Sequence, residues 1–112
     1  MKNLTISVRS HFSKEQLENF LDTAGRGASY WCNNNLEYPS KVQKVLSGES
    51  VSIMDIEKNK HYWLNLKAVK RGLTTMAKKE SKHFADFISE DFDQTTGDIF
   101  LQCCLFGKVI YG

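Results

Sequence analysis

The residues with the clearest chemical potential lie in one short segment, Gly25-Arg26-Gly27-Ala28-Ser29-Tyr30-Trp31-Cys32. Gly27 would allow a close approach to the backbone, and Arg26 could pair with a phosphate group through two hydrogen bonds. Tyr30 or Trp31 could stack on a nucleobase. The segment lacks the Lys-Ser/Thr pair of a P-loop, and its glycines follow a predicted helix instead of opening one. Two interpretations stand: a surface for a ligand or partner, or aromatic side chains that anchor a core.

Cysteine offers a weaker candidate chemistry. Cys32, Cys103 and Cys104 show no Cys-x-x-Cys spacing, and two adjacent cysteines on a helix point in different directions. A zinc site would have to recruit His61 or His83 from elsewhere in the chain. Cys32 could act as a nucleophile only if the fold brought a histidine to it. We therefore expect no metal, no cofactor and no catalytic residue, and we interpret the cysteines as small buried hydrophobic residues.

The acidic segment Asp91–Thr95 has the Asp-x-Asp-x-Thr pattern of haloacid-dehalogenase-like phosphotransferases. Those enzymes need a lysine and further carboxylates far downstream, and little sequence follows here. A calcium loop fits no better, because the glycine comes one position late and Gln102 stands where glutamate is required. We interpret the segment as a connection in which Asp93 or Thr95 caps the next helix.

Two further patterns could form a contact surface. Tyr62 and Trp63 are adjacent on a predicted strand, so one of the two must point away from the core. An exposed tryptophan would mark a contact surface. Basic residues also cluster on and after a predicted helix, either as a solvated face or as a site for phosphates or an acidic protein; they are Lys67, Lys70, Arg71, Lys78, Lys79 and Lys82.

Helical elements are predicted from apolar spacing and capping signals. Ser13-Lys14-Glu15-Gln16 forms a capping box and predicts a helix over 13–24, with Gly25 as its left-handed stop. A helical turn is expected around Val42–Leu46, and a longer helix over 66–77. The stripe around 84–88 either continues that helix or forms a separate one. The apolar run 99–106 fits a buried strand or a buried helix. A capping-box pattern at Thr95-Thr96-Gly97-Asp98 and a stop at Gly107 favour a central core helix, in which Gln102 needs a buried partner.

Strands are predicted by alternation. The residues 4–8 alternate apolar and polar side chains, as in a half-buried strand. The runs 51–56 and 61–66 predict a hairpin with a four-residue loop at 57–60, and 109–111 predicts a short closing strand. Together these elements predict an α+β fold: a small antiparallel sheet packed against three or four helices, with the C-terminal helix at its centre.

Composition sets the outer limits. The chain has 112 residues and predicts a single domain over 1–112. Its 15 basic and 13 acidic residues give a net charge of +2, so the total charge gives no support to nucleic-acid binding. No apolar run is long enough to span a membrane, and three cysteines suit a reducing compartment. We expect a cytoplasmic protein that does not engage a membrane.

Two segments together carry a family resemblance. The segment Gly25–Cys32 is similar to a Gly-Gly-x-x-Tyr-Trp-Cys stretch that follows the first helix in many small proteins of phages, prophages and plasmids. The segment Gly97–Gly112 resembles their C-terminal signature, which has Asp near its start, a central Gln and a final Leu-Phe-Gly-x-apolar-apolar-Tyr-Gly. Arg26 departs from the glycine that these proteins often carry. The resemblance implies an accessory protein of a mobile element in the bacterial cytoplasm, and supplies no catalytic residue.

Because small accessory phage proteins often act by binding, the resemblance implies a non-enzymatic binding protein of a phage or mobile element that antagonises a bacterial host defence protein. The expected partner is a host bacterial protein, and a homo-oligomer remains open. One alternative is a sponge that sequesters a nucleotide immune signal, and another is a nucleic-acid-binding accessory protein. The residues predicted to bind the ligand or partner are Arg26, Tyr30, Trp31, Tyr62 and Trp63.

Overall fold

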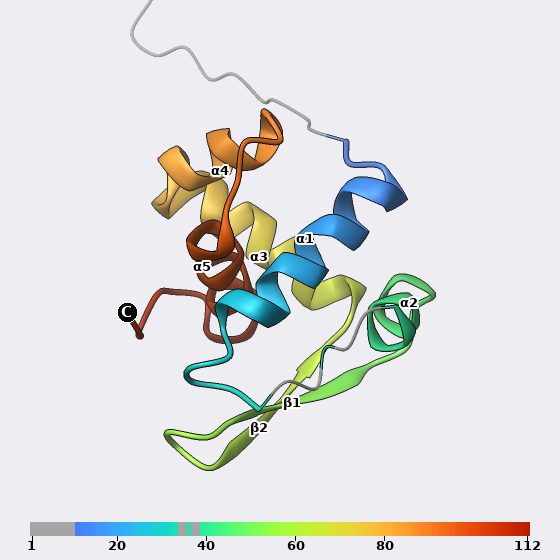
Figure 1. Ribbon diagram of the computed structural model, residues 1–112, viewed down its shortest axis with the longest axis vertical. Helices are drawn as coiled ribbons and strands as arrows, with labels where there is room; N and C mark the ends of the chain where they lie inside the picture. The colour runs from blue at the N-terminus through green and yellow to red at the C-terminus, as the bar shows by residue number, and fades with distance from the viewer. Residues whose placement is uncertain (1–10, 34–35, 37–38) are drawn as a thin grey trace, which may run out of the picture.

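The computed structural model describes residues 11–33, 36 and 39–112 (Figure 1). Within these ranges it contains five helices and one two-stranded sheet: α1 (Lys14–Gly27), α2 (Ser40–Leu46), β1 (Val51–Asp55), β2 (Lys60–Leu64), α3 (Leu66–Lys79), α4 (Ser81–Ile88) and α5 (Gln94–Phe106). The predicted α+β class is confirmed, with a small antiparallel sheet and a C-terminal helix that packs against several elements. The strand expected over 4–8 lies outside the described residues.

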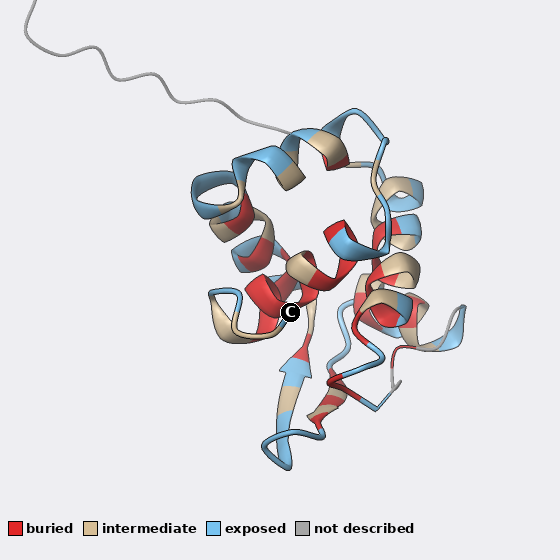
Figure 2. Cartoon of the chain, turned by 60° about the vertical axis from the view of Figure 1, so that its left-hand side comes forward, coloured by how far each residue is buried: buried red, intermediate tan, exposed pale blue. Residues whose placement is uncertain are grey.

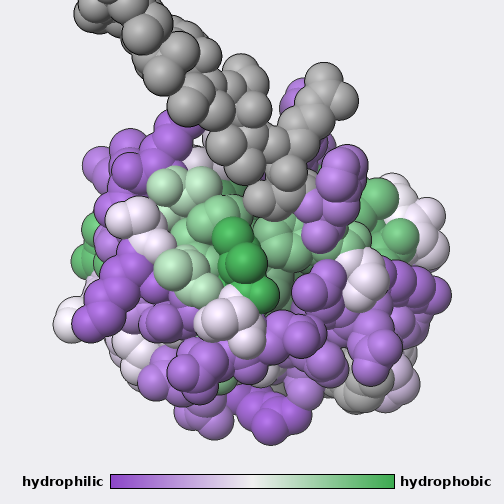
Figure 3. Space-filling view, turned by 90° about the horizontal axis from the view of Figure 1, so that it is seen from above, coloured by the Kyte–Doolittle hydropathy of each residue, from purple (hydrophilic) through white to green (hydrophobic). Residues whose placement is uncertain are grey.

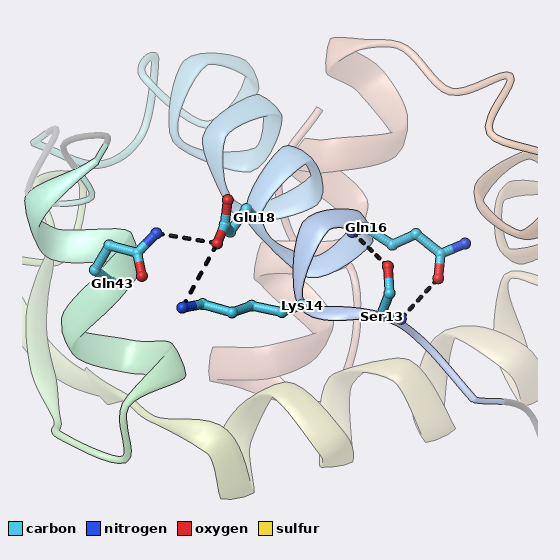
Figure 4. A network of polar contacts seen from close by, with 5 residues as sticks. All are labelled: Ser13, Lys14, Gln16, Glu18 and Gln43. Atoms are coloured by element: carbon cyan, nitrogen blue, oxygen red, sulfur yellow. Dashed lines mark hydrogen bonds and ion pairs between the residues drawn. The ribbon is translucent and has the colours of Figure 1, made fainter.

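Helix α1 begins where the sequence predicts it and ends later. The Ser13 Oγ accepts a hydrogen bond from the Gln16 N–H at 3.1 Å, and the Ser13 N–H donates to the Gln16 Oε1 at 2.8 Å (Figure 4). The predicted capping box is therefore confirmed. The predicted stop at Gly25 is wrong, because the helix continues to Gly27 and buries Gly25.

A polar contact links α1 to the short helix α2. The Glu18 carboxylate lies 4.0 Å from the Lys14 ammonium and accepts a hydrogen bond from the Gln43 side chain at 3.0 Å (Figure 4). On the other side of α2, Val42 and Val45 are fully buried. The helical turn predicted in this region is thus confirmed, and its two valines hold it against the core.

Helix α5 runs through the middle of the molecule, between α1, α3 and α4 (Figures 1 and 2). The carboxylate of Asp93 caps its start by accepting from the Thr96 N–H at 3.0 Å. Gly107 ends it with a φ of 72°, a left-handed conformation that glycine adopts without strain. Most residues between these ends are buried, as the apolar run predicts.

Glycines allow α5 to approach its neighbours closely. A Cβ on Gly97 would lie 2.8 Å from the backbone nitrogen of Ala24 in α1, and a Cβ on Gly27 would collide with the backbone of Gln94. Gly72 of α3 faces Cys104 in the same way. Gly27 therefore permits close packing of two helices rather than the approach of a ligand.

The hairpin projects from one end of the helical body (Figures 1 and 2). Its strands pair antiparallel, with Val51 opposite Leu64 and Asp55 opposite Lys60, so a four-residue loop connects them as predicted, shifted by one position. The inner face carries Val51, Ile53, Asp55, Tyr62 and Leu64. The outer face carries Ser52, Met54, His61 and Trp63, and we refer to these four residues as the outer hairpin face.

The remaining segments answer two questions that the sequence leaves open. The stripe around 84–88 belongs to a separate helix, α4, which the break at Glu80 divides from α3. The predicted strand over 109–111 is wrong, because these residues adopt no regular secondary structure. No described helix has the length and apolar character needed to cross a bilayer.

Candidate functional site

The aromatic bend after α1 closes onto the start of α5. The Trp31 side chain is fully buried, and its indole N–H donates to the Asp98 Oδ1 at 2.7 Å. The Tyr30 hydroxyl donates to the other carboxylate oxygen of Asp98 at 2.6 Å. Burial and this hydrogen bond to a carboxylate raise the pKa of Tyr30 to about 12. The two segments that carry the family resemblance are therefore joined by direct hydrogen bonds.

Gln102 extends the network from Asp98 to the end of the chain. Its side-chain amide donates to Asp98 Oδ1 at 3.0 Å and to the Tyr111 carbonyl at 3.2 Å. Its carbonyl oxygen accepts from the N–H groups of Ile110 and Tyr111 at 2.8 and 2.9 Å. The predicted need for a buried partner is confirmed. These bonds also explain why 109–111 forms no strand, since a side chain takes the place of a neighbouring strand.

The same network reaches the hairpin through Tyr111. The Tyr111 hydroxyl donates to the Asp55 Oδ2 at 2.7 Å, and the Asp55 Oδ1 accepts from the N–H of Glu57 at 3.0 Å. Asp55 is fully buried at the end of β1. Burial and the neighbouring Asp55 raise the pKa of Tyr111 to about 12. The end of the chain thus fixes the loop of the hairpin.

Four aromatic rings fill the space around this network. The Trp31 ring centroid lies 5.2 Å from that of Phe106 and 5.5 Å from that of Tyr111. Tyr62, on the inner face of the hairpin, meets Phe106 edge-to-face at 4.9 Å. Such ring pairs stabilise the fold beyond the contribution of the apolar area that they bury. Tyr62 and Trp31 therefore act in the fold, and neither forms an open stacking surface.

The structure does not assemble the five predicted site residues into one surface. The expectation that Trp31 grips a ligand is corrected by its complete burial. Arg26 forms an ion pair with Asp22 one turn earlier in α1. Tyr30 is 49% exposed, although its hydroxyl donates a hydrogen bond to Asp98. The predicted surface is therefore divided between the core, the end of α1 and the hairpin.

Trp63 is the most exposed aromatic residue among the predicted site residues. It is 62% exposed, and it lies opposite Ser52 on the outer hairpin face. On the same face, the Ser52 Oγ lies 2.9 Å from the His61 Nδ1, and Met54 pairs with His61. The question of which neighbouring aromatic points outward is settled: Tyr62 faces inward and Trp63 faces outward.

The thiols are poorly suited to nucleophilic chemistry. Burial, with added repulsion from the carboxylates of Asp98 and Asp55, raises the pKa of Cys32 to about 11. Burial raises the pKa of Cys103 to about 11 and that of Cys104 well above its ordinary value. All three are free and buried. Because the thiolate is the reactive form, these shifts suppress reactivity near neutral pH. No cluster of three metal-ligating side chains occurs in the described part of the chain.

The basic cluster is divided between structural and open positions. The Arg71 guanidinium donates to the Cys104 carbonyl at 2.8 Å, and the Lys79 ammonium lies 3.5 Å from the Gly107 carbonyl. These two side chains contact the C-terminal end of α5 and the glycine that follows it. Lys70 and Lys78 instead border an apolar groove beside α3. The cluster is therefore not one uniform phosphate-binding face.

Sequence reasoning missed two carboxylates that hold the network together. Asp98 has a recognisable signal, because it falls within the C-terminal signature and precedes the central Gln102 by one helical turn. Asp55 has none, since an acidic residue at the end of a strand is typical of a solvated turn. Comparison of the chain with protein-family models, with curated proteins and with solved structures found no match.

Proposed function

We propose that this chain is a non-enzymatic binding protein of a phage or mobile element, which acts in the bacterial cytoplasm by antagonising a host defence protein. The observation that carries the binding role is the outer hairpin face, where Trp63 is 62% exposed beside His61 and Met54. The setting comes from the resemblance of the segments 25–32 and 97–112 to small accessory proteins of mobile elements.

Trp63 has the properties of an interface anchor. A large exposed aromatic side chain buries a large apolar area when a partner covers it, and tryptophan is enriched among the residues that dominate binding energy. The opposite face of the same hairpin is held by Tyr62 against Phe106 and by Asp55 against Tyr111. The strand that presents Trp63 is therefore held in place before binding, which lowers the entropy lost on association.

The nucleotide sponge fits the geometry less well. That hypothesis needs an aromatic ring free to stack and an arginine free to meet a phosphate. The Trp31 ring is buried, and Arg26 is paired with Asp22. Direct nucleic-acid binding would draw on the basic cluster, in which Arg71 and Lys79 bind backbone carbonyls of the protein itself.

The test is capture of a host protein by tagged chain expressed in bacteria, with quantitative comparison of Trp63→Ala and the unaltered protein. The matched control is Ile88→Ala, which removes an exposed apolar side chain from α4. We expect Trp63→Ala to lose the captured defence protein and the antagonism of phage restriction, while Ile88→Ala keeps both. Equal capture and antagonism by Trp63→Ala would contradict the proposal. A thermal shift with a cyclic nucleotide that Tyr30→Ala abolishes would favour the sponge.

A further inference from the structure

A groove opens on the helical body of the protein. It has a volume of about 580 Å³, and helices α1, α3 and α4 contribute to its walls. Its apolar lining includes Phe12, Leu17, Leu66, Leu73 and Phe84. Figure 3 shows a face of the molecule with a central hydrophobic patch, and hydrophilic side chains surround much of it. A concave apolar surface of this kind on a small protein is typical of an interaction site.

The charged groups at the groove are of one sign. Lys70 and Lys78 line it from α3, and no described acidic residue does so. Lys78 follows Lys70 by eight positions, which corresponds to roughly 12 Å along the helix axis, or about two turns. In the described part of the chain, the ion pairs are those of Lys14 and Arg26, so both groove lysines lack an acidic partner there. The hydroxyl of Thr74, between them, donates to the Lys70 carbonyl at 2.9 Å.

We propose that this groove binds an amphipathic α-helix of a partner protein, whose apolar side chains enter the groove and whose acidic side chains meet Lys70 and Lys78. The apolar lining supplies the driving force, since burying it removes hydrocarbon surface from water. The two ammonium groups supply orientation and selectivity, because they favour carboxylates placed about two turns apart on one side of the ligand.

A helix suits this groove better than an extended peptide. The walls are helices, whose backbone groups are already bonded within each helix, so the groove offers no strand edge to a bound peptide. An extended chain would bury its own N–H and C=O groups against hydrocarbon without partners. A helix satisfies those groups internally and presents only side chains. The hollow shape also favours a rod-like ligand over a flat lipid surface.

This inference assigns a second contact surface and does not depend on the outer hairpin face. Its test uses a fluorescent synthetic helix of about 18 residues, or five turns, as a probe for the full chain. The probe carries a leucine stripe and two glutamates two turns apart at its edge. Two matched probes replace these glutamates by glutamine or by lysine. Binding is measured by fluorescence anisotropy.

We expect the glutamate probe to bind roughly fivefold tighter than the glutamine probe, as two exposed ion pairs allow, and the lysine probe to bind weakest. Raising the salt concentration should reduce the differences in affinity between the three probes. The double variant Lys70→Glu/Lys78→Glu should reverse the order of the three probes. Ala77→Glu, at an exposed position that lines the groove, should abolish binding, whereas Ala85→Glu on the exposed side of α4 should not.

Four results would overturn the proposal. The first is failure of the glutamate probe to bind the unaltered protein when circular dichroism shows that this protein is folded. The second is equal binding of the three probes. The third is a stable dimer in sedimentation velocity that Ala77→Glu dissociates, which would assign the groove to a second copy. The fourth is stoichiometric displacement of the probe by dodecanoate, which would assign it to a fatty acid. Loss of binding through Trp63→Ala is not expected, so the two surfaces are tested independently.

Discussion

The indole of Trp31 donates a hydrogen bond of 2.7 Å to the carboxylate of Asp98, across 67 positions of sequence. This bond ties the bend after α1 to the N-terminal half of α5, and Asp98 is in turn hydrogen-bonded to Gln102. A buried carboxylate is stable only when its oxygens are hydrogen-bonded, and Tyr30, Trp31 and Gln102 supply three donors to it. The two segments of family resemblance therefore form one structural network, which leaves the exposed positions available for binding.

Removing the indole donor should destabilise the protein. Trp31→Phe keeps an aromatic ring in the core but takes one hydrogen bond from Asp98 and leaves a small void. We expect the free energy of unfolding to fall by about 2–3 kcal/mol, the cost of losing a buried hydrogen bond to a charged group together with some packing. Urea denaturation followed by circular dichroism measures the change.

Trp63→Phe is the matched control, because the outer hairpin face exposes that side chain. We expect its free energy of unfolding to change by less than about 0.5 kcal/mol, as for other surface substitutions. A Trp31→Phe protein as stable as the Trp63→Phe protein would show that the bond between Trp31 and Asp98 contributes nothing to the fold.

Helices and strands were predictable from the sequence where residues close together in the chain determine them. The capping box at Ser13, the two strands of the hairpin with their four-residue loop, and the apolar run that ends at Gly107 all act through neighbouring residues. The stop expected at Gly25 failed for a tertiary reason. Glycines near a helix end predict termination, but here Gly27 lets the helix continue against the backbone of Gln94.

The candidate site was less predictable, because long-range partners decide it. Trp31 is indistinguishable by sequence from a stacking residue, and its burial depends on partners distant in the chain, namely Asp98, Phe106 and Tyr111. Tyr62 and Trp63 satisfy the strand pattern equally well. Which of them faces outward depends on the register of the hairpin and on the ring of Phe106, which lies 44 positions after Tyr62 in the chain.

Close packing of α1 on α5 should make Gly97 intolerant of a side chain. A methyl group there would lie 2.8 Å from the Ala24 nitrogen, and the backbone of α1 cannot yield as a flexible side chain would. We expect Gly97→Ala to lower the free energy of unfolding by about 1–3 kcal/mol, although alanine is the better helix former. Thermal unfolding compares it with Thr95→Ala, an exposed change in the same turn, which should be nearly neutral.

The Gln102 side chain should control the order of the last residues. Gln102→Leu keeps a similar volume, but it leaves the N–H groups of Ile110 and Tyr111 without their acceptor. We expect the free energy of unfolding to fall by about 2–4 kcal/mol and amide hydrogen exchange at these two positions to accelerate more than in α5. Gln94→Ala, at the exposed start of α5, should leave both amides protected. Unchanged protection in Gln102→Leu would contradict the assigned role.

Alkaline pH should weaken the fold through Tyr30 and Tyr111. In the folded protein both pKa values are raised from the ordinary 10.0 to about 12, so between these limits the folded state binds more protons than the unfolded state. The stabilisation is therefore complete below pH 10 and is lost as the pH rises through about 12. The thiols of Cys32 and Cys103, with pKa values raised from 9.0 to about 11, add to the loss from about pH 9 upward.

Urea midpoints measured across this range, with spectrophotometric titration of the phenols, test this prediction. We expect Tyr30→Phe and Tyr111→Phe each to make the alkaline loss of stability shallower, because each removes a proton that only the folded state retains above pH 10. The thiols are common to all three proteins, so the difference between each variant and the unaltered chain isolates the tyrosine contribution. If the phenols of Tyr30 and Tyr111 titrate at their ordinary pKa in the native protein, this result would contradict their hydrogen bonds to Asp98 and Asp55.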